Sequence, residues 1–203
     1  MTSTLPRSRS TDRRYYGVVE AIVATVTGDP EHECRVTLRF PFFDGATAES
    51  DWCRVIQPYA GNGYGAVFVP EVGDEVLVAF VHGDMRVPVL LGGLYNGADK
   101  PADPRTAQDN KKTFRTKAGH LITLNDSAGS LGIEVRTNDG NRVHLDDNAD
   151  TITVEIPGGP SVTLGKNGGT LALKATSISI EATSIKIAAS GTLEATGHPI
   201  KLN

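Results

Sequence analysis

The chain of 203 residues has few aromatic residues, and they are very unevenly placed. Eleven of the twelve lie between Tyr15 and Tyr95, the last is Phe114, and none follows it. Aromatic side chains supply much of the buried area of a compact core, so the second half of the chain must be stabilised in another way. The distribution alone predicts a boundary between two structural units.

The sequence also lacks a basic stripe, a long apolar run and a metal-binding cysteine pattern. Residues 15–97 hold four Arg and no Lys against eleven Asp or Glu, which is the opposite of a nucleic-acid-binding surface. No stretch is long enough to span a bilayer and no signal-peptide pattern is present, so we expect folding in a cytoplasm. The two cysteines, Cys34 and Cys53, are expected to be reduced and half-buried in strands.

Short strands separated by turns predict a small barrel over residues 15–97, after a flexible arm at 1–14. Apolar or alternating runs typical of strands occur at 17–23, 34–40, 75–81 and 88–92. About five strands in about eighty residues indicate an oligonucleotide/oligosaccharide-binding (OB) barrel. The glycine-rich Gly61–Gly65 is interpreted as a turn and not as a dinucleotide-binding loop, because a predicted strand at 66–69 follows it and that loop needs a helix.

Residues 98–113 read as an extended linker, and residues 114–203 as a ladder of short strands. Five predicted strands at turn-separated positions are centred on 123–124, 133–135, 143–145, 152–154 and 162–164. A repeat follows, in which Leu173, Ile180, Ile187 and Leu193 are spaced 7, 7 and 6 residues apart. A coiled coil would need apolar residues three and four apart. Here they are two apart, as on one face of a strand, so we favour the β interpretation.

This tail predicts three chains. Each strand offers one or two aliphatic side chains to a core, too few for a single chain to offset the cost of ordering its backbone, roughly 1–2 kcal/mol per residue. We expect three intertwined copies to form a triangular prism, with backbone groups pairing between chains. The predicted trimer core consists of Leu171, Leu173, Ile178, Ile180, Ile185, Ile187 and Leu193.

Five segments carry a resemblance to a known family. They are 35–41 (RVTLRFP), 52–61 (WCRVIQPYAG) and 63–80 (GYGAVFVPEVGDEVLVAF), followed by 82–92 (HGDMRVPVLLG) and Leu94-Tyr95-Asn96. Together they resemble the barrel of phage baseplate spike proteins and of VgrG proteins of type VI secretion. Residues 116–126 (TKAGHLITLND) look like that family's entry into its triple-stranded β-helix.

The resemblance implies an all-β homotrimer, an OB barrel followed by a β-prism needle, at the baseplate end of a contractile injection system. Such a spike joins a hub protein and inner tube to a PAAR-type tip protein, and it pierces the target-cell membrane. VgrG chains carry a hub domain ahead of the barrel, and only a short arm stands there in this sequence, so a separate hub is expected. The implied hub contacts are Arg7, Arg9, Arg13 and Arg14, and the implied tip contacts are His198, Pro199, Ile200, Lys201, Leu202 and Asn203.

Other readings are open at this point. A phage tail, a free extracellular particle and a type VI relative would all suit the pattern, with assembly in a bacterial cytoplasm. A trimeric stalked module that binds a cell-surface glycan is the main alternative. No catalytic pair or cofactor motif is found, so we expect neither enzyme activity nor a cofactor. No metal site is expected, although one His198 per chain would supply three ligands on a threefold axis.

Overall fold

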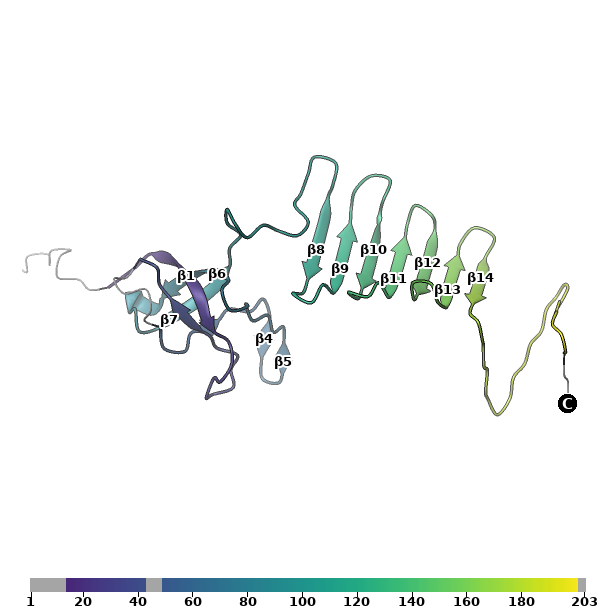
Figure 1. Ribbon diagram of the computed structural model, residues 1–203, viewed down its shortest axis with the longest axis horizontal. Coiled ribbons are helices and arrows are strands. Elements are labelled where there is room, and N and C mark those ends of the chain that lie inside the picture. Colours follow the sequence, from purple (N-terminus) through teal and green to yellow (C-terminus); the bar gives the residue numbers. More distant parts are fainter. Residues whose placement is uncertain (1–13, 43–48, 201–203) are drawn as a thin grey trace, which may run out of the picture. The chain divides into compact units, whose positions relative to one another are not determined.

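The computed structural model describes residues 14–42 and 49–200, and the chain divides into two compact units, Met1–Ala102 and Asp103–Asn203. Among the described residues, regular structure consists of β-strands and one short 3-10 turn, η2 (Val81–Gly83) (Figure 1). The all-β prediction is therefore confirmed. None of these residues forms a helix long and apolar enough to cross a membrane.

The first unit is a five-stranded sheet in the order β2-β1-β6-β7-β3. Its strands are β1 (Val18–Thr25), β2 (Thr37–Arg39), β3 (Arg54–Val55), β6 (Glu75–Phe80) and β7 (Pro88–Gly93). All neighbours are antiparallel except β3 and β7, which are parallel. A small hairpin of β4 (Ala60–Gly61) and β5 (Tyr64–Gly65) stands apart from this sheet, and it confirms the predicted turn at Gly61–Gly65.

The two edge strands of this sheet are joined, which closes it into a barrel. Val36, just before β2, and Cys53, just before β3, exchange two backbone hydrogen bonds of 3.0 and 2.7 Å. Alternate residues of β1 and β6 point inward and are buried, as their period of two requires. The closed five-stranded sheet around one apolar core is the OB architecture that the sequence predicted.

A buried carboxylate fixes the loop that leads into β2. Asp29 accepts backbone hydrogen bonds from Glu31, Glu33 and Arg35, and the Arg35 guanidinium lies 2.6 Å from its Oδ1. Two predictions in this region are wrong. Cys34 is exposed, with a left-handed φ of 59°, because the loop around Asp29 takes it out of the expected strand. Cys53 is fully buried, and burial raises the pKa of its thiol to about 11.

The segment 66–69 is also not the strand that was predicted. The Gln57 side chain both donates to the carbonyl oxygen of Phe68 and accepts from its backbone N–H, at 3.1 and 2.9 Å. The amide of Gln57 thus takes the place of a neighbouring strand.

The second unit is a seven-stranded antiparallel meander in which each strand pairs with the one before it. Its strands are β8 (Lys111–Arg115), β9 (Leu121–Asn125), β10 (Gly132–Arg136), β11 (Arg142–Asp146), β12 (Thr151–Glu155), β13 (Ser161–Gly165) and β14 (Thr170–Lys174). All five strand centres predicted between residues 123 and 164 fall inside β9–β13. β8 begins within the predicted linker, and no described residue after Lys174 belongs to a strand.

Strand pairing in the meander differs from the expected pairing between chains. β8 to β14 pair within one chain, because each strand from β8 to β13 is followed by a turn that reverses it; β8 and β14 are the edge strands and are paired on one side only. Pairing between copies stays a prediction only for the residues after β14.

The Asp29 network gives the barrel a specific pH dependence. The side-chain hydrogen bond from Arg35, helped by three backbone N–H groups, holds the pKa of the Asp29 carboxyl well below its usual range. A depressed carboxyl pKa contributes stability above the unfolded pKa, about 3.9, that is lost as the pH falls below it. We expect Asp29→Asn to lower the melting temperature clearly at pH 7 and much less near pH 2.

The matched control is Asp51→Asn, because Asp51 is exposed. Thermal melts followed by circular dichroism at both pH values make the measurement. An equal loss for Asp29→Asn at the two pH values would contradict the assignment.

Candidate assembly surface

One face of the β9–β14 sheet is a continuous apolar surface. Its twelve aliphatic side chains are between 37% and 63% exposed. They are Ile122, Leu124, Ile133, Val135, Val143, Leu145, Ile152, Val154, Val162, Leu164, Leu171 and Leu173. In β9 to β13 the intervening residues on the opposite face are all at least partly buried, so the apolar face is the more exposed one. Such a face in water marks an interaction surface.

The strand register sorts these side chains into two columns along the sheet. The valine column contains Ile122, Val135, Val143, Val154, Val162 and Leu173. The leucine–isoleucine column contains Leu124, Ile133, Leu145, Ile152, Leu164 and Leu171. Each strand from β10 to β13 therefore places one valine beside one larger side chain, two residues away on the same face.

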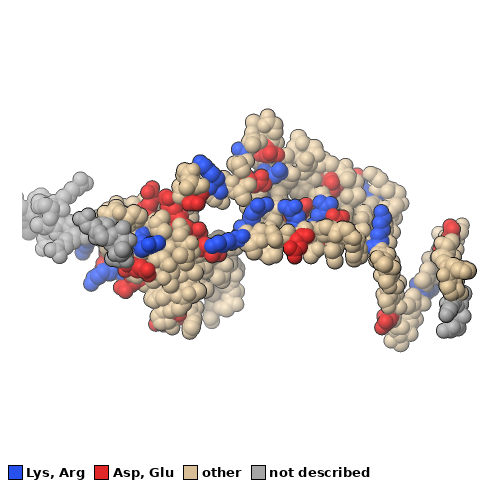
Figure 2. Space-filling view, viewed as in Figure 1, with Lys and Arg blue, Asp and Glu red and all other residues tan. Residues whose placement is uncertain are grey.

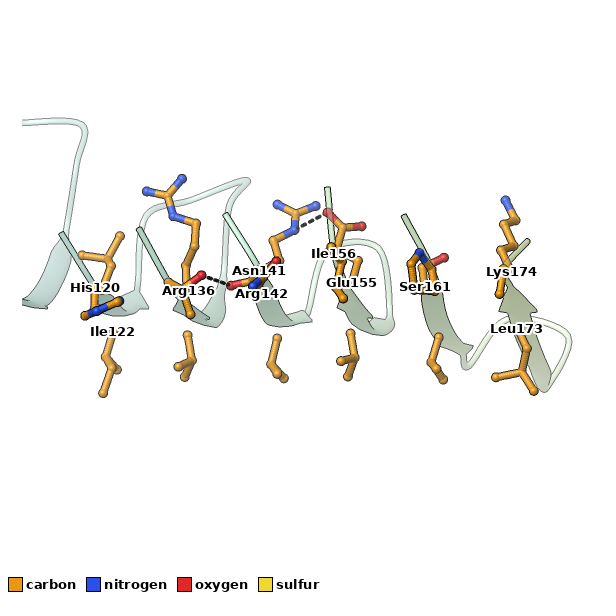
Figure 3. Close-up of a pocket in the computed structure, with 18 of the residues that line it drawn as sticks. His120, Ile122, Arg136, Asn141, Arg142, Glu155, Ile156, Ser161, Leu173 and Lys174 are labelled. Carbon is orange, nitrogen blue, oxygen red and sulfur yellow. Dashed lines mark hydrogen bonds and ion pairs between the residues drawn. The ribbon is translucent and has the colours of Figure 1, made fainter. Parts of the chain in front are cut away.

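An open groove of about 760 Å³ follows the valine column. Its floor is formed by that column, together with Phe114 at the start, and its wall by turn residues such as Ile156 and Pro160. Ile178 lines its far end. Figure 3 shows Ile122 and Leu173 on one side of the strands, and Arg136, Arg142 and Lys174 on the other.

Charged side chains connect the strands on the opposite face. Glu134 lies between Arg136 and Arg142, at 3.4 and 3.6 Å. The buried Nε of Arg142 is 2.8 Å from a Glu155 oxygen, as an ion pair without hydrogen-bond alignment. Lys and Arg side chains follow one another along this unit in the space-filling view (Figure 2). This face is polar and its charges are largely paired, as suits contact with water.

Residues with left-handed backbone conformation occur in the turns that connect the strands of the meander. Gly119, Gly140, Gly158 and Gly168 have φ values between 70° and 94°, one in each of four turns. At Gly140 an added Cβ would also lie 3.0 Å from Cγ of Pro157 in the next turn on the same edge. The turns on one edge are thus close-packed along the direction in which the strands stack.

The seven residues of the predicted trimer core are all more than half exposed in the single chain. Leu171 and Leu173 lie in β14, on the apolar face, at 63% and 52%. The other five are Ile178, Ile180, Ile185, Ile187 and Leu193, and they follow β14 in a segment without strand pairing. No partner within the described residues covers them, so their role as a trimer core stays a prediction.

The predicted partner contacts are only partly described. His198, Pro199 and Ile200 are exposed, whereas Lys201, Leu202 and Asn203 lie outside the described residues. Within residues 14–42 and 49–200 no three His, Cys, Asp or Glu side chains gather to hold a metal. Of the predicted hub contacts, Arg14 is described and exposed, and Arg7, Arg9 and Arg13 lie outside the described residues.

Sequence reasoning missed an aromatic cluster next to Arg14. Tyr15 packs against Phe42 and Phe80, with ring centroids 6.3 and 5.8 Å away, and its backbone N–H donates to Gly83. Arg14 donates to the Tyr16 hydroxyl at 3.1 Å. The cluster holds the first described residues of the chain against the barrel. The concentration of aromatics before Tyr95 was its only signal in the sequence.

Both ends of the linker are also anchored, which composition did not reveal. Asn96 binds Glu75 at 2.8 Å and accepts from the backbone N–H groups of Ala98 and Asp99. The buried Ser127 hydroxyl accepts from the N–H of Asn110 at 2.8 Å. The chain is therefore held to its own unit immediately after the barrel and immediately before β8.

The barrel is the part of this chain that a known family model matches. Residues 19–95 match the family of the type VI secretion system/phage-baseplate injector OB domain. Among similar proteins are the actin cross-linking toxin VgrG1 of Vibrio cholerae, 35% identical over 123 residues, and the spike protein VgrG4b of Pseudomonas aeruginosa, 34% identical over 108. The spike protein VgrG3 of Vibrio cholerae is 30% identical over 123 residues. The barrel is thus similar to an injector OB domain, and two of these three similar proteins are named as type VI secretion system spike proteins.

The matches cover about half of this chain and a small part of each relative. They span 53%, 49% and 54% of the chain, and 11%, 13% and 12% of VgrG1, VgrG4b and VgrG3. The similarity therefore concerns only this small part of each relative, and what the remaining parts do is said only of those proteins.

The turns of the meander generate a stability prediction. We expect Gly140→Ala to destabilise the protein by about 1–2 kcal/mol, because an L-residue with a side chain is strained at φ 89° and its Cβ meets Pro157. The control is Gly92→Ala, since a Cβ there meets nothing within 4 Å and the φ is not left-handed. Denaturant melts of both variants measure the difference, and equal midpoints would contradict the turn's role.

Proposed function

We propose that this protein is the homotrimeric central spike at the baseplate end of a contractile injection system. It joins a hub and inner tube to a tip protein and is driven through the target membrane. Its role is mechanical, without catalysis, and it is assembled in the bacterial cytoplasm. The injector barrel and the spike relatives support the class of machine. The uncovered apolar face supports the trimer.

The apolar face is the observation that carries the proposal. Twelve aliphatic side chains, each still about half exposed, would be covered by two further copies. Completing their burial contributes on the order of 10 kcal/mol per chain, at roughly 1 kcal/mol for each half-buried side chain. Three such sheets, apolar faces inward, close a triangular prism whose outer surface is the polar face.

A change in the chain after β14 supports a second mode of association. Up to Gly169 the chain has a left-handed residue in nearly every turn, whereas none occurs between residues 170 and 200. The repeat also shortens to seven residues. A chain that does not reverse cannot pair with the strand it has just formed, so we infer that residues 175–193 wind around the other two copies. Their backbone groups would then pair between chains.

The trimer is tested by solution mass under native conditions. We expect light scattering to give about 64.5 kDa, three times the chain mass of 21.5 kDa. Leu164→Glu places a charge on the apolar face and should shift the mass toward that of one chain. The matched control, Thr163→Glu, places the same charge on the opposite face of the same strand and should leave the trimer intact.

A solution mass of 21.5 kDa for the native protein would contradict the trimer and favour the glycan-binding module. Dissociation by both glutamate variants would show that the effect is not specific to the apolar face.

The two ends of the chain are proposed to bind different partners. Replacing Arg7, Arg9, Arg13 and Arg14 with Gln should weaken binding of the hub protein and leave binding of the PAAR-type tip protein unchanged. Removing residues 198–203 should do the reverse, because each change leaves the trimer core intact. Pull-down of each purified partner by both variants makes the measurement, and loss of both partners in either variant would contradict the assignment.

A further inference from the structure

We propose that in the trimer the leucine–isoleucine column of each copy fills the groove over the valine column of the next copy. The inference rests on the proposed trimer and adds which side chains meet across it. It also explains how identical sheets are made to point the same way.

The first argument is one of shape. The groove follows the valine column and is not lined by any member of the leucine–isoleucine column. From β10 to β13 the groove floor is valine in every strand, and the other column alternates isoleucine and leucine. A floor of small side chains and a ridge of larger ones are complementary, as in well-packed cores where large residues face small ones. The turns around Ile156 and Pro160 supply the outer wall of the groove.

The second argument is one of charge. The two long edges of the sheet consist of the strand ends and turns from β8 to β14. Their net charges have opposite signs. The edge beside the valine column carries five Lys or Arg residues and two carboxylates. The other edge carries two Lys residues and four carboxylates. β11 shows the contrast within one strand, because it begins at Arg142 and ends at Asp146, followed by Asp147.

Both patterns favour one arrangement of copies. In a closed ring of three, one patch of each copy meets a different patch of its neighbour. The valine groove then receives the larger column, and the basic edge faces the acidic edge. If one copy were turned end for end with its apolar face still inward, valine would meet valine and like-charged edges would meet. Size and charge therefore both select three parallel copies.

The test is a cysteine cross-link in the full-length protein, with the exposed Cys34 replaced by Ser. Val143→Cys and Leu145→Cys together should join neighbouring copies on mild oxidation, giving a band of three chain masses on a non-reducing denaturing gel. Residues two apart on one strand are about 6.7 Å apart. This distance is too long for a disulfide, which needs the two Cβ atoms roughly 4 Å from each other. The cross-link can therefore form only between copies.

The single variants are the controls. Val143→Cys alone and Leu145→Cys alone should each stay at one chain mass, because like columns do not meet. Cross-linked dimers from either single variant would overturn the proposal. The proposal would also be overturned if the double variant were trimeric by light scattering when reduced but formed no cross-link on oxidation. Something other than the leucine–isoleucine column would then fill the groove.

A reduced native protein that is monomeric would instead overturn the trimer itself, so the two failures are distinguishable. Val154→Cys with Ile152→Cys repeats the measurement one strand further along. It guards against a local packing defect in β11.

Discussion

The apolar face of β9–β14 is left exposed within the single chain, and this is the main physical constraint on the structure. The barrel buries its own core, in which Val36, Leu38 and Cys53 are fully shielded. The meander satisfies every strand with backbone hydrogen bonds and yet leaves its aliphatic side chains exposed. Backbone hydrogen bonds thus define the sheet, whereas full burial of its apolar face would need a further covering surface. The second unit therefore has a complete hydrogen-bonded sheet but no enclosed apolar core of its own.

The two units also differ in how they are stiffened. The Val36–Cys53 bridge closes the barrel, and the Asp29 network fixes the loop before β2. Neither contact is part of a repeating pattern. The meander is stiffened by repetition, with turns such as that at Gly140 packed on the next turn along one edge. Anchors at Asn96 and Ser127 leave little of the connecting segment unattached. Each unit therefore has a hydrogen-bonded anchor near the boundary between the two units.

Much of this could be predicted from alternation and turn residues. The strands at 123–164 were found because their apolar residues alternate and because Gly, Asn and Asp mark their ends. The departures have local causes. Cys34 is drawn out of a strand by Asp29, and the amide of Gln57 replaces a partner strand for 66–69. β8 was missed because Lys111 and Lys112 hide its strand pattern. Pairing within the chain was missed because the strands were expected to pair with strands of the other two copies.

The back-and-forth path of the meander restricts how this protein can change in length. Removing one strand with its turn would reverse every later strand, so that Arg142 and Asp146 would exchange edges and the columns would exchange places. Removing a whole hairpin of two strands leaves both faces and both edges in order. At about 4.8 Å between strands, the meander can thus grow or shrink only in steps of about 9.6 Å. The length of this sheet is therefore a quantity that evolution can adjust only in whole hairpins.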